Sequence, residues 1–450
     1  MKQVVTTRKE KIAYAFGNMG GYVLWAFTAA YITVYATDCL QFSSGGWAYG
    51  ALGFIILISR FFDGFSDIGA GILIDRTHTR WGKARPWFGF SILPLSLVFF
   101  LLFCLRGRSE AATLACLGIL YFLFTVVFYT INNIGFNAML PRISNDPHDQ
   151  TRISTLDSIF TSVGSLAAAM AIPILGMLGG SDQASSWRIL TGCLALLAVL
   201  TQGICFFGVR EKAEICPPET ASVSRETLKA GFRALFRTKY FYIAVAMFFI
   251  NFYISLSVSS VGKYYAQWVL GNANYYSLMG SLPMITMGIG LICTPSLEKK
   301  FGKRRAMMLA IGSVLLGNLI GSAAPSSVAV AMTGAMVKGL GLAAVMCELY
   351  TLAPDIVRYV QRQSGVRIEG LAAAANSFGC KIGSGIGSAV VIWMIALCRY
   401  DASAPSIAAS TRTAFISLYW WVPTVLSAVL LFLASRWKIE QELGAEEGKR

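Results

Sequence analysis

Charged residues and histidine are scarce in this chain of 450 residues. Only 14% of the residues are charged and two are histidine, whereas 55% are hydrophobic. The ten cysteines and two histidines show neither the CxxC nor the HxxH spacing of a metal site. The sequence also lacks a recognisable pairing of nucleophile and base. We therefore expect no metal centre, no disulfide, no cofactor and no enzymatic activity.

What the sequence has instead is a series of long apolar runs. Each run is long enough to cross a bilayer core of about 30 Å as a helix, and a soluble domain does not need so much apolar surface. We predict an all-α membrane protein with twelve transmembrane helices. The predicted spans are residues 14–37, 47–73, 87–105, 112–139, 154–178, 187–209, 239–266, 275–296, 306–323, 326–355, 371–397 and 412–434.

Lysine and arginine are unevenly distributed between the loops. Most lie in the two terminal segments and in alternate loops such as 75–86, 298–305 and 356–370, whereas loops 38–46 and 267–274 hold none. The positive-inside rule then places both termini in the cytoplasm of a multi-pass plasma membrane protein, the inner membrane in a bacterium. The net charge of +15 follows from this asymmetry. The bilayer is therefore the expected partner, with no nucleic acid and no obligatory protein partner.

A polar segment at residues 210–238 divides the predicted spans six and six. We expect an N-terminal six-helix bundle at 1–209, a cytoplasmic loop at 210–238 and a C-terminal six-helix bundle at 239–450. The sequence after the second span, DRTHTRWGKARP at 75–86, is weakly repeated after the eighth as LEKKFGKRRA at 297–306. Repeated halves are typical of transporters that alternate access to a central cavity.

The second span carries three charged residues on one helical face. Arg60, Asp63 and Asp67 are three and four residues apart, which places two carboxylates one turn apart beside a guanidinium. Charge inside an apolar segment is costly and is found mainly where it meets a partner, an ion or water. This helix is therefore the first candidate for an ion site. The alternative for Asp63 is a structural ion pair with Arg60.

Five motifs spread over both halves carry a family resemblance. They are RFFDGFSD at 60–67, TRWGKARPW at 79–87, YTINNIGFNAMLPRIS at 129–144, GVRIEGL at 365–371 and FGCKIGSG at 378–385. These motifs resemble the glycoside–pentoside–hexuronide cation symporters, which include the melibiose and glucuronide permeases. The resemblance implies the fold of the major facilitator superfamily. It also implies uptake of a sugar or glycoside coupled to Na⁺, H⁺ or Li⁺.

The same resemblance implies a cation site. In family members that use Na⁺, the carboxylates matching Asp63 and Asp67 are ligands, helped by the hydroxyl that matches Thr130. Ser66 offers a further hydroxyl at a position that is often asparagine. Hard oxygen donors suit Na⁺, and either carboxylate could instead accept a proton, so Na⁺ and H⁺ both stay open.

Two basic residues are expected to couple the cation to transport. Lys381 resembles the lysine that the family places near its cation site, and Arg60 lies on the same helix as both carboxylates. Together with the two acids they form a cluster whose net charge changes when a cation enters. The alternative for Lys381 is that it simply neutralises the two acids in the substrate-free state, which is part of its role in the family.

The expected sugar site departs from the melibiose pattern. Melibiose-type members have acids in the first and fourth spans, where this chain has Asn18 beside Met19, and Asn133. In the fifth span Asp157 stands where many members have an arginine. Asn133 resembles the asparagine of glucuronide-type permeases, and an amide does not repel an acidic sugar as a carboxylate does.

Lys338 adds a cation well inside the tenth predicted span. With Asn133 it favours a hexuronide or a glycoside of one, whereas Asp157 favours a neutral or amino sugar. Lys338 could instead snorkel or pair with a carboxylate such as Asp157. Aromatic candidates for stacking on the sugar are Tyr22, Trp25, Tyr129, Tyr253 and Tyr350.

A further group of charged residues lies at the predicted cytoplasmic ends of helices. In superfamily relatives such groups lock the two bundles together in the outward-facing state, so we expect a gate here. Its residues are Asp75, Arg76, Arg80, Lys83, Arg85, Asp355, Arg358, Arg367 and Glu369. Eukaryotic relatives of the family move lysolipids with Na⁺. A cation-dependent carrier of lysolipids or other amphipathic solutes is therefore the second hypothesis for the function.

Overall fold

The described part of the chain is helical and falls into two compact units. The computed structural model describes residues 6–42, 47–105, 109–144, 146–212, 236–364, 369–401, 404, 406–439 and 442. One unit comprises Met1–Pro218 and Ser388–Ile407, and the other comprises Glu219–Gly387 and Ala408–Arg450. The predicted division into six and six spans stays a prediction.

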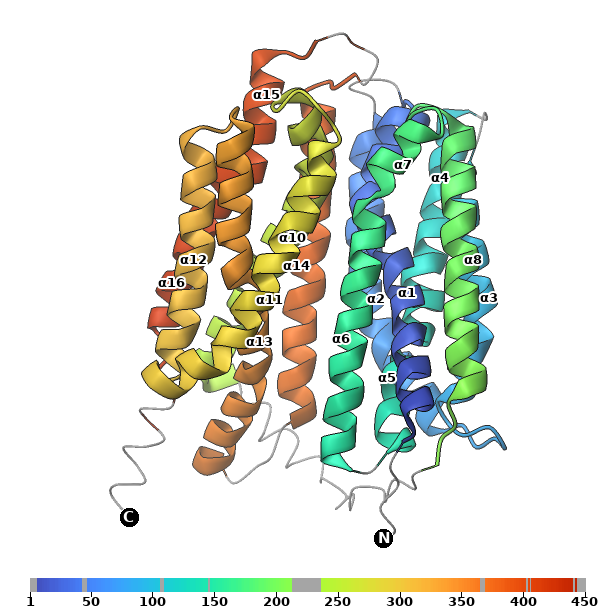
Figure 1. Ribbon diagram of the computed structural model, residues 1–450, viewed down its shortest axis with the longest axis vertical. Coiled ribbons are helices and arrows are strands. Elements are labelled where there is room, and N and C mark those ends of the chain that lie inside the picture. The colour runs from blue at the N-terminus through green and yellow to red at the C-terminus, as the bar shows by residue number, and fades with distance from the viewer. Residues whose placement is uncertain are drawn as a thin grey trace. The chain divides into compact units, whose positions relative to one another are not determined.

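The first unit is built around its N-terminal helix. Figure 1 shows α1 lying between α6 and α8, against which it makes most of its contacts. A capping box starts α1, because the Thr7 hydroxyl accepts a hydrogen bond from the Glu10 amide and the Glu10 carboxylate accepts one from the Thr7 amide. The elements of this unit are α1 (Arg8–Val34), η1 (Tyr35–Cys39), α2 (Trp47–Asp75), α3 (Arg85–Leu102), α4 (Glu110–Phe122), η2 (Leu123–Tyr129), α5 (Thr130–Ile143), α6 (Pro147–Ala169), α7 (Ala171–Met177) and α8 (Ala184–Gly208).

The second unit is organised around a long helix, α13, which packs against α11 and α12. Helix α14 crosses the boundary between the units, which falls after Gly387. The elements are α10 (Lys239–Trp268), α11 (Tyr275–Phe301), α12 (Lys303–Ala323), α13 (Val328–Ser364), α14 (Glu369–Leu397), α15 (Ala409–Ile416), η3 (Ser417–Trp421) and α16 (Val422–Ser435).

The helices of the described residues account for the predicted spans once α2 is included. Ten of them are long and apolar enough to cross a membrane, and the bent pair α6 and α7 makes eleven. Helix α2, which carries Arg60, Asp63 and Asp67, falls outside this set. Adding α2 to the eleven gives the twelve predicted spans.

The fifth span is bent where the sequence predicts one continuous helix at 154–178. Helix α6 ends at Ala169, and α7 continues at an angle of 40°. Pro173 in α7 has no amide hydrogen, so it cannot donate to the carbonyl of Ala169 four residues earlier. The Tyr31 hydroxyl donates to that carbonyl instead, at 3.4 Å. The Ala169 carbonyl that loses its helical donor at the bend is therefore still hydrogen-bonded inside the apolar region.

The tenth span is longer than predicted. The sequence places a turn at 356–370, but α13 continues without a break to Ser364. Pro354 lies inside this helix and does not end it. Asp355, the next residue, forms ion pairs with Lys303 on α12 and with Arg358 one turn further along α13.

A buried amide connects three helices of the first unit. Asn132 on α5 donates to Ser91 Oγ on α3 and to Gln202 Oε1 on α8, each at 2.9 Å. All three side chains are buried. Because the loss of one partner would leave a buried polar group unsatisfied, this network fixes the rotation of α5 and so the direction of its other side chains.

Helices α12 and α13 cross at two glycines. A Cβ on Gly317 would lie 2.6 Å from the Gly334 carbonyl oxygen and would also clash with the amide of Lys338. A Cβ on Gly334 would lie 2.8 Å from the Gly317 carbonyl oxygen. The backbones therefore touch directly, as small residues allow between membrane helices, and the crossing fixes the position of Lys338.

This close crossing generates a stability prediction. Gly317→Ala should lower the thermal unfolding midpoint of the purified protein by several degrees, because overpacking typically costs about 1–3 kcal/mol. Gly312→Ala is the matched control on α12, since no atom lies within 4 Å of a Cβ built there. It should leave the midpoint unchanged or raise it, because alanine is the better helix former. Equal midpoints for the two variants would contradict the crossing.

Candidate functional site

The predicted cation ligands on α2 and α5 lie together in the first unit. Thr130 Oγ1 donates to Asp63 Oδ1 at 2.8 Å, and Ser66 Oγ lies 3.3 Å from Thr130 Oγ1. Asp63 and Thr130 are both buried. Asp67 lies one turn further along α2 and is half-buried. The oxygen atoms of Asp63, Ser66 and Thr130, which come from two helices, therefore lie close together. These residues are three of the predicted cation ligands.

A π-helical turn shapes the α5 side of this cluster. Segment η2 comes directly before Thr130 and widens the helix by one residue per turn. As a result Thr130 Oγ1 lies 3.2 Å from the carbonyl oxygen of Thr125, five residues earlier. Thr125 was not among the predicted site residues, because a π-helical turn has no clear signature in an apolar sequence. The carbonyl adds a further hard oxygen beside the hydroxyl.

Arg60 is buried among aromatic side chains next to the carboxylates. Its guanidinium carbon lies 5.8 Å from the centre of the Trp25 ring, and the guanidinium is hydrogen-bonded to the Tyr121 hydroxyl. Tyr121 is a site residue that the sequence analysis missed, since one tyrosine among many in apolar spans carries no distinguishing signal. The aromatic surroundings stabilise the guanidinium by cation–π attraction where water is excluded.

Three predicted aromatic residues form a row that leads to the cation cluster. The ring centres of Tyr22 and Trp25 are 5.7 Å apart, and those of Trp25 and Tyr129 are 6.3 Å apart and stacked. Tyr129 directly precedes Thr130, whose hydroxyl donates to Asp63. The structure therefore links aromatic faces suited to a sugar with the predicted cation ligands.

The predicted sugar residues Asn18 and Asp157 contact each other. Asn18 Nδ2 on α1 donates to Asp157 Oδ2 on α6 at 2.9 Å. The other carboxylate oxygen, Oδ1, is buried and has no hydrogen-bond partner among the described residues. Asn133 is half-buried on α5, and its carbonyl accepts a hydrogen bond from Asn137. Asp157 thus presents one occupied and one available acceptor.

Lys338 is buried in an aromatic enclosure in the second unit. Its ammonium lies 6.0 Å from the ring centre of Tyr419 and 6.0 Å from that of Trp420. Tyr419 stacks on Tyr265, with ring centres 4.4 Å apart. Both enclosing residues lie in the π-helical segment η3, which sequence patterning does not reveal. No carboxylate among the described residues forms an ion pair with Lys338.

The remaining predicted residues of the second unit lie on other helices or faces. Lys381 is half-buried on α14, where Ser384 donates to its carbonyl. Tyr350 on α13 is 60% exposed and meets Phe248 edge to face. Tyr253 is half-buried on α10 beside Phe249.

The predicted gate residues of the first unit surround the turn between α2 and α3. Arg142 at the end of α5 approaches Asp75 to 3.7 Å. Glu211 accepts hydrogen bonds from the backbone amides of Lys83, residue 84 and Arg85. The Arg85 side chain donates to the carbonyl of Phe206 at the end of α8. Arg76 and Arg80 are exposed.

The gate residues of the second unit centre on Asp355. This buried carboxylate forms ion pairs with Lys303 and with Arg358. The predicted residue Arg367 and the side chain of Glu369 lie outside the described part of the chain. The ion-pair partners Arg142 and Lys303 are not among the gate residues that the sequence predicts.

A repeated motif could have identified these partners. Arg142 and Asp355 each follow a proline and precede an isoleucine, in PRI at 141–143 and PDI at 354–356. Lys83 and Lys303 each follow a glycine with positive φ, Gly82 and Gly302. The two halves thus place charges at matching points, but with opposite sign after the proline.

Comparison with known proteins gives the family of this chain. The sequence profile of the family described as MFS/sugar transport protein matches residues 13–441. The isoprimeverose transporter of Lactiplantibacillus pentosus is 26% identical over 97% of this chain and 90% of its own length. The glucuronide carrier protein homolog of Escherichia coli is 24% identical over 96% of both chains.

A solved structure shows the same fold. The nucleoside transporter NupG has a TM-score of 0.64 at 13% identity, over 94% of this chain and 98% of that chain. The predicted all-α membrane fold of the major facilitator superfamily is therefore confirmed, and so is the resemblance of the sequence to sugar transporters of that superfamily. This multi-pass membrane chain belongs to the MFS/sugar transport protein family.

Proposed function

We propose that this protein is a secondary active transporter that couples uptake of a sugar or glycoside to Na⁺ or H⁺ by alternating access. The contact between Asp63 and Thr130 inside apolar helices carries this proposal. A buried carboxylate that is held by a hydroxyl and lies beside a second carboxylate is suited to receive a cation. The names of the relatives, which are transporters of sugars and glycosides, support the same class of substrate.

The charge of the cluster provides the coupling. Within the first unit, Asp63, Asp67 and Arg60 sum to one negative charge when all three are ionised. Binding of Na⁺ or a proton neutralises this charge, which lowers the cost of exposing the cluster to a low-dielectric surrounding during the transport cycle. Lys381 on α14 is the further basic residue that the family resemblance assigns to coupling. The cation is thus cargo and coupling ion, and no cofactor takes part.

Each unit offers its own candidate contacts for the sugar. In the first unit, the row formed by Tyr22, Trp25 and Tyr129 offers aromatic faces, and Asp157 Oδ1 offers an acceptor for a hydroxyl. In the second unit, Lys338 offers a positive charge without a carboxylate partner among the described residues. These contacts suit a hexuronide or a glycoside of one, whose carboxylate pairs with Lys338.

The protein acts as a carrier within the bilayer, with both termini in the cytoplasm. This orientation follows from the lysine and arginine residues of alternate loops. Asp75 at the end of α2 pairs with Arg142, and Asp355 inside α13 pairs with Lys303 at the start of α12, next to those basic loops. Transport needs only the small solute, the coupling ion and the membrane, and involves no chemical conversion of the solute.

The cation site is tested by removing each carboxylate. Asp63→Asn and Asp67→Asn should abolish accumulation of the sugar in proteoliposomes under an imposed Na⁺ or H⁺ gradient. Each substitution removes one negative charge and one anionic oxygen ligand from the cluster, so cation binding should weaken by roughly 10- to 100-fold. Asp182→Asn, which removes an exposed loop carboxylate, is the matched control.

Folding controls show whether a loss of accumulation comes from the cation site or from unfolding of the protein. Both variants should insert, purify and unfold at a midpoint near that of the unmodified protein. Normal accumulation by both variants would refute the cation site. Accumulation of a lysolipid in place of every sugar tested would refute the proposed substrate class.

The role of the Thr130 hydroxyl is tested by a pair of substitutions. Thr130→Val keeps the shape of the side chain and removes the hydroxyl, so it should weaken the apparent affinity for the coupling cation by about 3- to 10-fold. Thr130→Ser keeps the hydroxyl and should restore most of the affinity. The measurement is sugar uptake against cation concentration. If serine and valine gave the same affinity, the hydroxyl would have no part in cation binding.

Lys338 is tested by comparing two substrates in one variant. Lys338→Gln should weaken uptake of a glucuronide by about tenfold, because it removes a charge-assisted contact with the carboxylate. Uptake of the matching neutral glucoside should change much less. The readout is the ratio of the two half-saturation concentrations. An equal effect on both sugars would remove Lys338 from the substrate site.

A further inference from the structure

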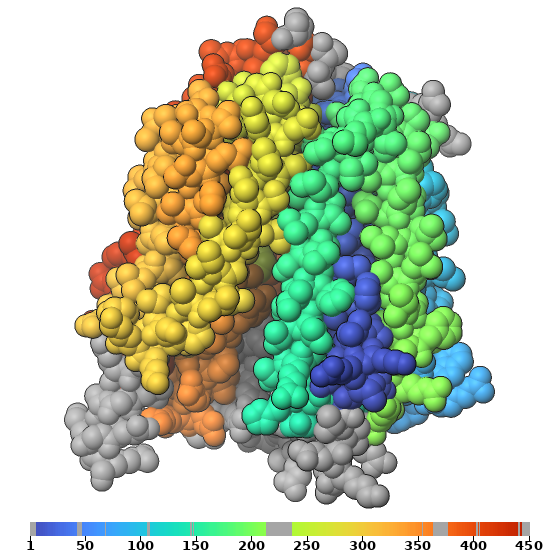
Figure 2. All heavy atoms as spheres, viewed as in Figure 1, coloured from blue at the N-terminus to red at the C-terminus, as the bar shows by residue number. Residues whose placement is uncertain are grey.

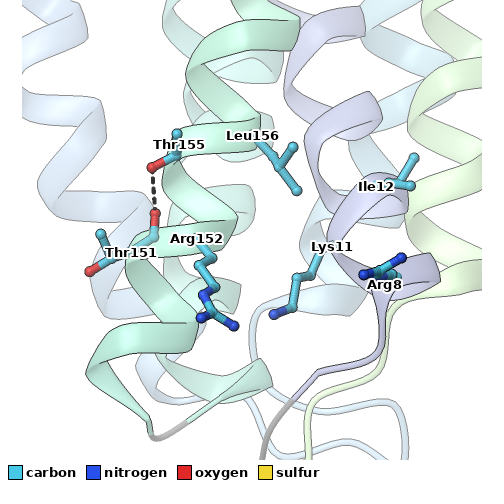
Figure 3. Close-up of a pocket in the computed structure, with 7 residues that line it drawn as sticks. All are labelled: Arg8, Lys11, Ile12, Thr151, Arg152, Thr155 and Leu156. Atoms are coloured by element: carbon cyan, nitrogen blue, oxygen red, sulfur yellow. Dashed lines mark hydrogen bonds between the residues drawn. The ribbon is translucent and has the colours of Figure 1, made fainter. Parts of the chain in front are cut away.

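A basic pocket opens between the first turns of α1 and α6, away from the cation cluster. Its volume is about 460 Å³, and residues from these two helices line it. Figure 3 shows the side chains of Lys11 and Arg152 extending towards each other across the gap. Arg8, one turn before Ile12 on α1, adds a third cation to the lining. The transport site described above uses none of these residues.

A buried carboxylate holds the two walls of the pocket together. Asp149 near the start of α6 forms an ion pair with Lys11 on α1. Its other oxygen, Oδ2, accepts hydrogen bonds from the amide of Thr6 at 2.9 Å and from the Thr6 hydroxyl at 2.7 Å. Asp149 is therefore fully engaged in joining the helices, and it neutralises only one of the three cations.

The pocket keeps an excess of positive charge. Arg8 and Arg152 are exposed, and neither forms an ion pair with any carboxylate of the described residues. Cations that extend into one pocket repel each other unless an anion lies between them. An anionic group seated there would remove this repulsion and gain contacts from both helices. The charge of the pocket therefore points to an anionic ligand.

The same two helices supply an apolar wall deeper in the span. Ile12 follows Arg8 by four residues, and Leu156 follows Arg152 by four residues, so a cation and an aliphatic side chain share one face of each helix. In Figure 3 Leu156 extends into the same gap as Arg152, one turn further along α6. The ligand therefore needs an anionic head and an apolar continuation.

The pocket faces the outer surface of the first unit. Figure 2 shows the first turns of α1, in dark blue, at the surface between α6 and α8. Arg8, Ile12, Arg152 and Thr155 are all exposed. The basic ends of these helices lie on the side that the positive-inside rule assigns to the cytoplasm, at the level of lipid headgroups. A lipid can therefore reach the pocket from within the bilayer.

We propose that this pocket binds the phosphate headgroup of an anionic phospholipid of the cytoplasmic leaflet. The phosphate lies between Arg8, Lys11 and Arg152, and an acyl chain runs along Ile12 and Leu156. Phosphate is also the chemistry of a free inorganic ion, but a free ion makes no use of the apolar wall. The bound lipid bridges α1 and α6 and adds to the connection that Asp149 makes.

The test measures thermal stabilisation of the full-length protein in a neutral detergent. Added phosphatidylglycerol should raise the unfolding midpoint with saturation, whereas phosphatidylcholine and inorganic phosphate should not. In the double variant Arg8→Gln/Arg152→Gln, the phosphatidylglycerol concentration for half the effect should rise by about 30-fold, since each cation near a membrane surface contributes about a factor of five. Arg8→Lys/Arg152→Lys should keep most of the effect.

A matched variant distinguishes binding in the pocket from non-specific electrostatic attraction of the anionic lipid to the protein. Lys299→Gln/Lys300→Gln removes two exposed charges from the end of α11, outside the pocket, and should respond to phosphatidylglycerol as the unmodified protein does. Equal losses in both double variants would overturn the proposal. Equal stabilisation by inorganic phosphate would also overturn it, in favour of a free anion. If the arginine double variant did not fold, Arg152→Gln alone would give the same comparison.

Discussion

The cost of placing charge inside apolar helices governs this structure. Asp63 and Arg60 are buried in α2, and Lys338 is buried in α13. Each has a local arrangement that makes its burial tolerable: a hydroxyl from Thr130 for the carboxylate, and aromatic faces for the two cations. Such charges are retained in a membrane protein because they act on an ion or a solute. The transport function proposed here depends on these arrangements.

Irregular helical turns lie beside two of these charged groups. Segment η2 brings the Thr125 carbonyl to the hydroxyl that holds Asp63, and segment η3 carries the tyrosine and the tryptophan that enclose Lys338. A regular α-helix would direct these groups differently, because a π-helical turn inserts one residue and rotates those that follow. Regular helices thus provide the scaffold, and the π-helical turns orient the functional groups.

Small residues and buried amides hold this scaffold in register. The Gly317 and Gly334 crossing brings two backbones into contact, and Asn132 ties α5 to α3 and α8. Neither device relies on apolar attraction between helices, which is weak where lipid is equally apolar. In the first unit, Asp149 joins the starts of α1 and α6 through polar contacts with Lys11 and Thr6.

The sequence alone determined the helical membrane class, because long apolar runs are a local signal, and its motifs gave the family resemblance from which the group of Asp63, Ser66 and Thr130 was predicted. Tertiary structure decided the rest. It showed that Tyr121 meets Arg60, that Arg142 and Lys303 complete the ion pairs of Asp75 and Asp355, and that Asn18 holds Asp157. It also bent the fifth span between Ala169 and Ala171 and extended the tenth beyond its expected end. These features depend on which helices pack together, and a pattern read along one helix does not contain that information.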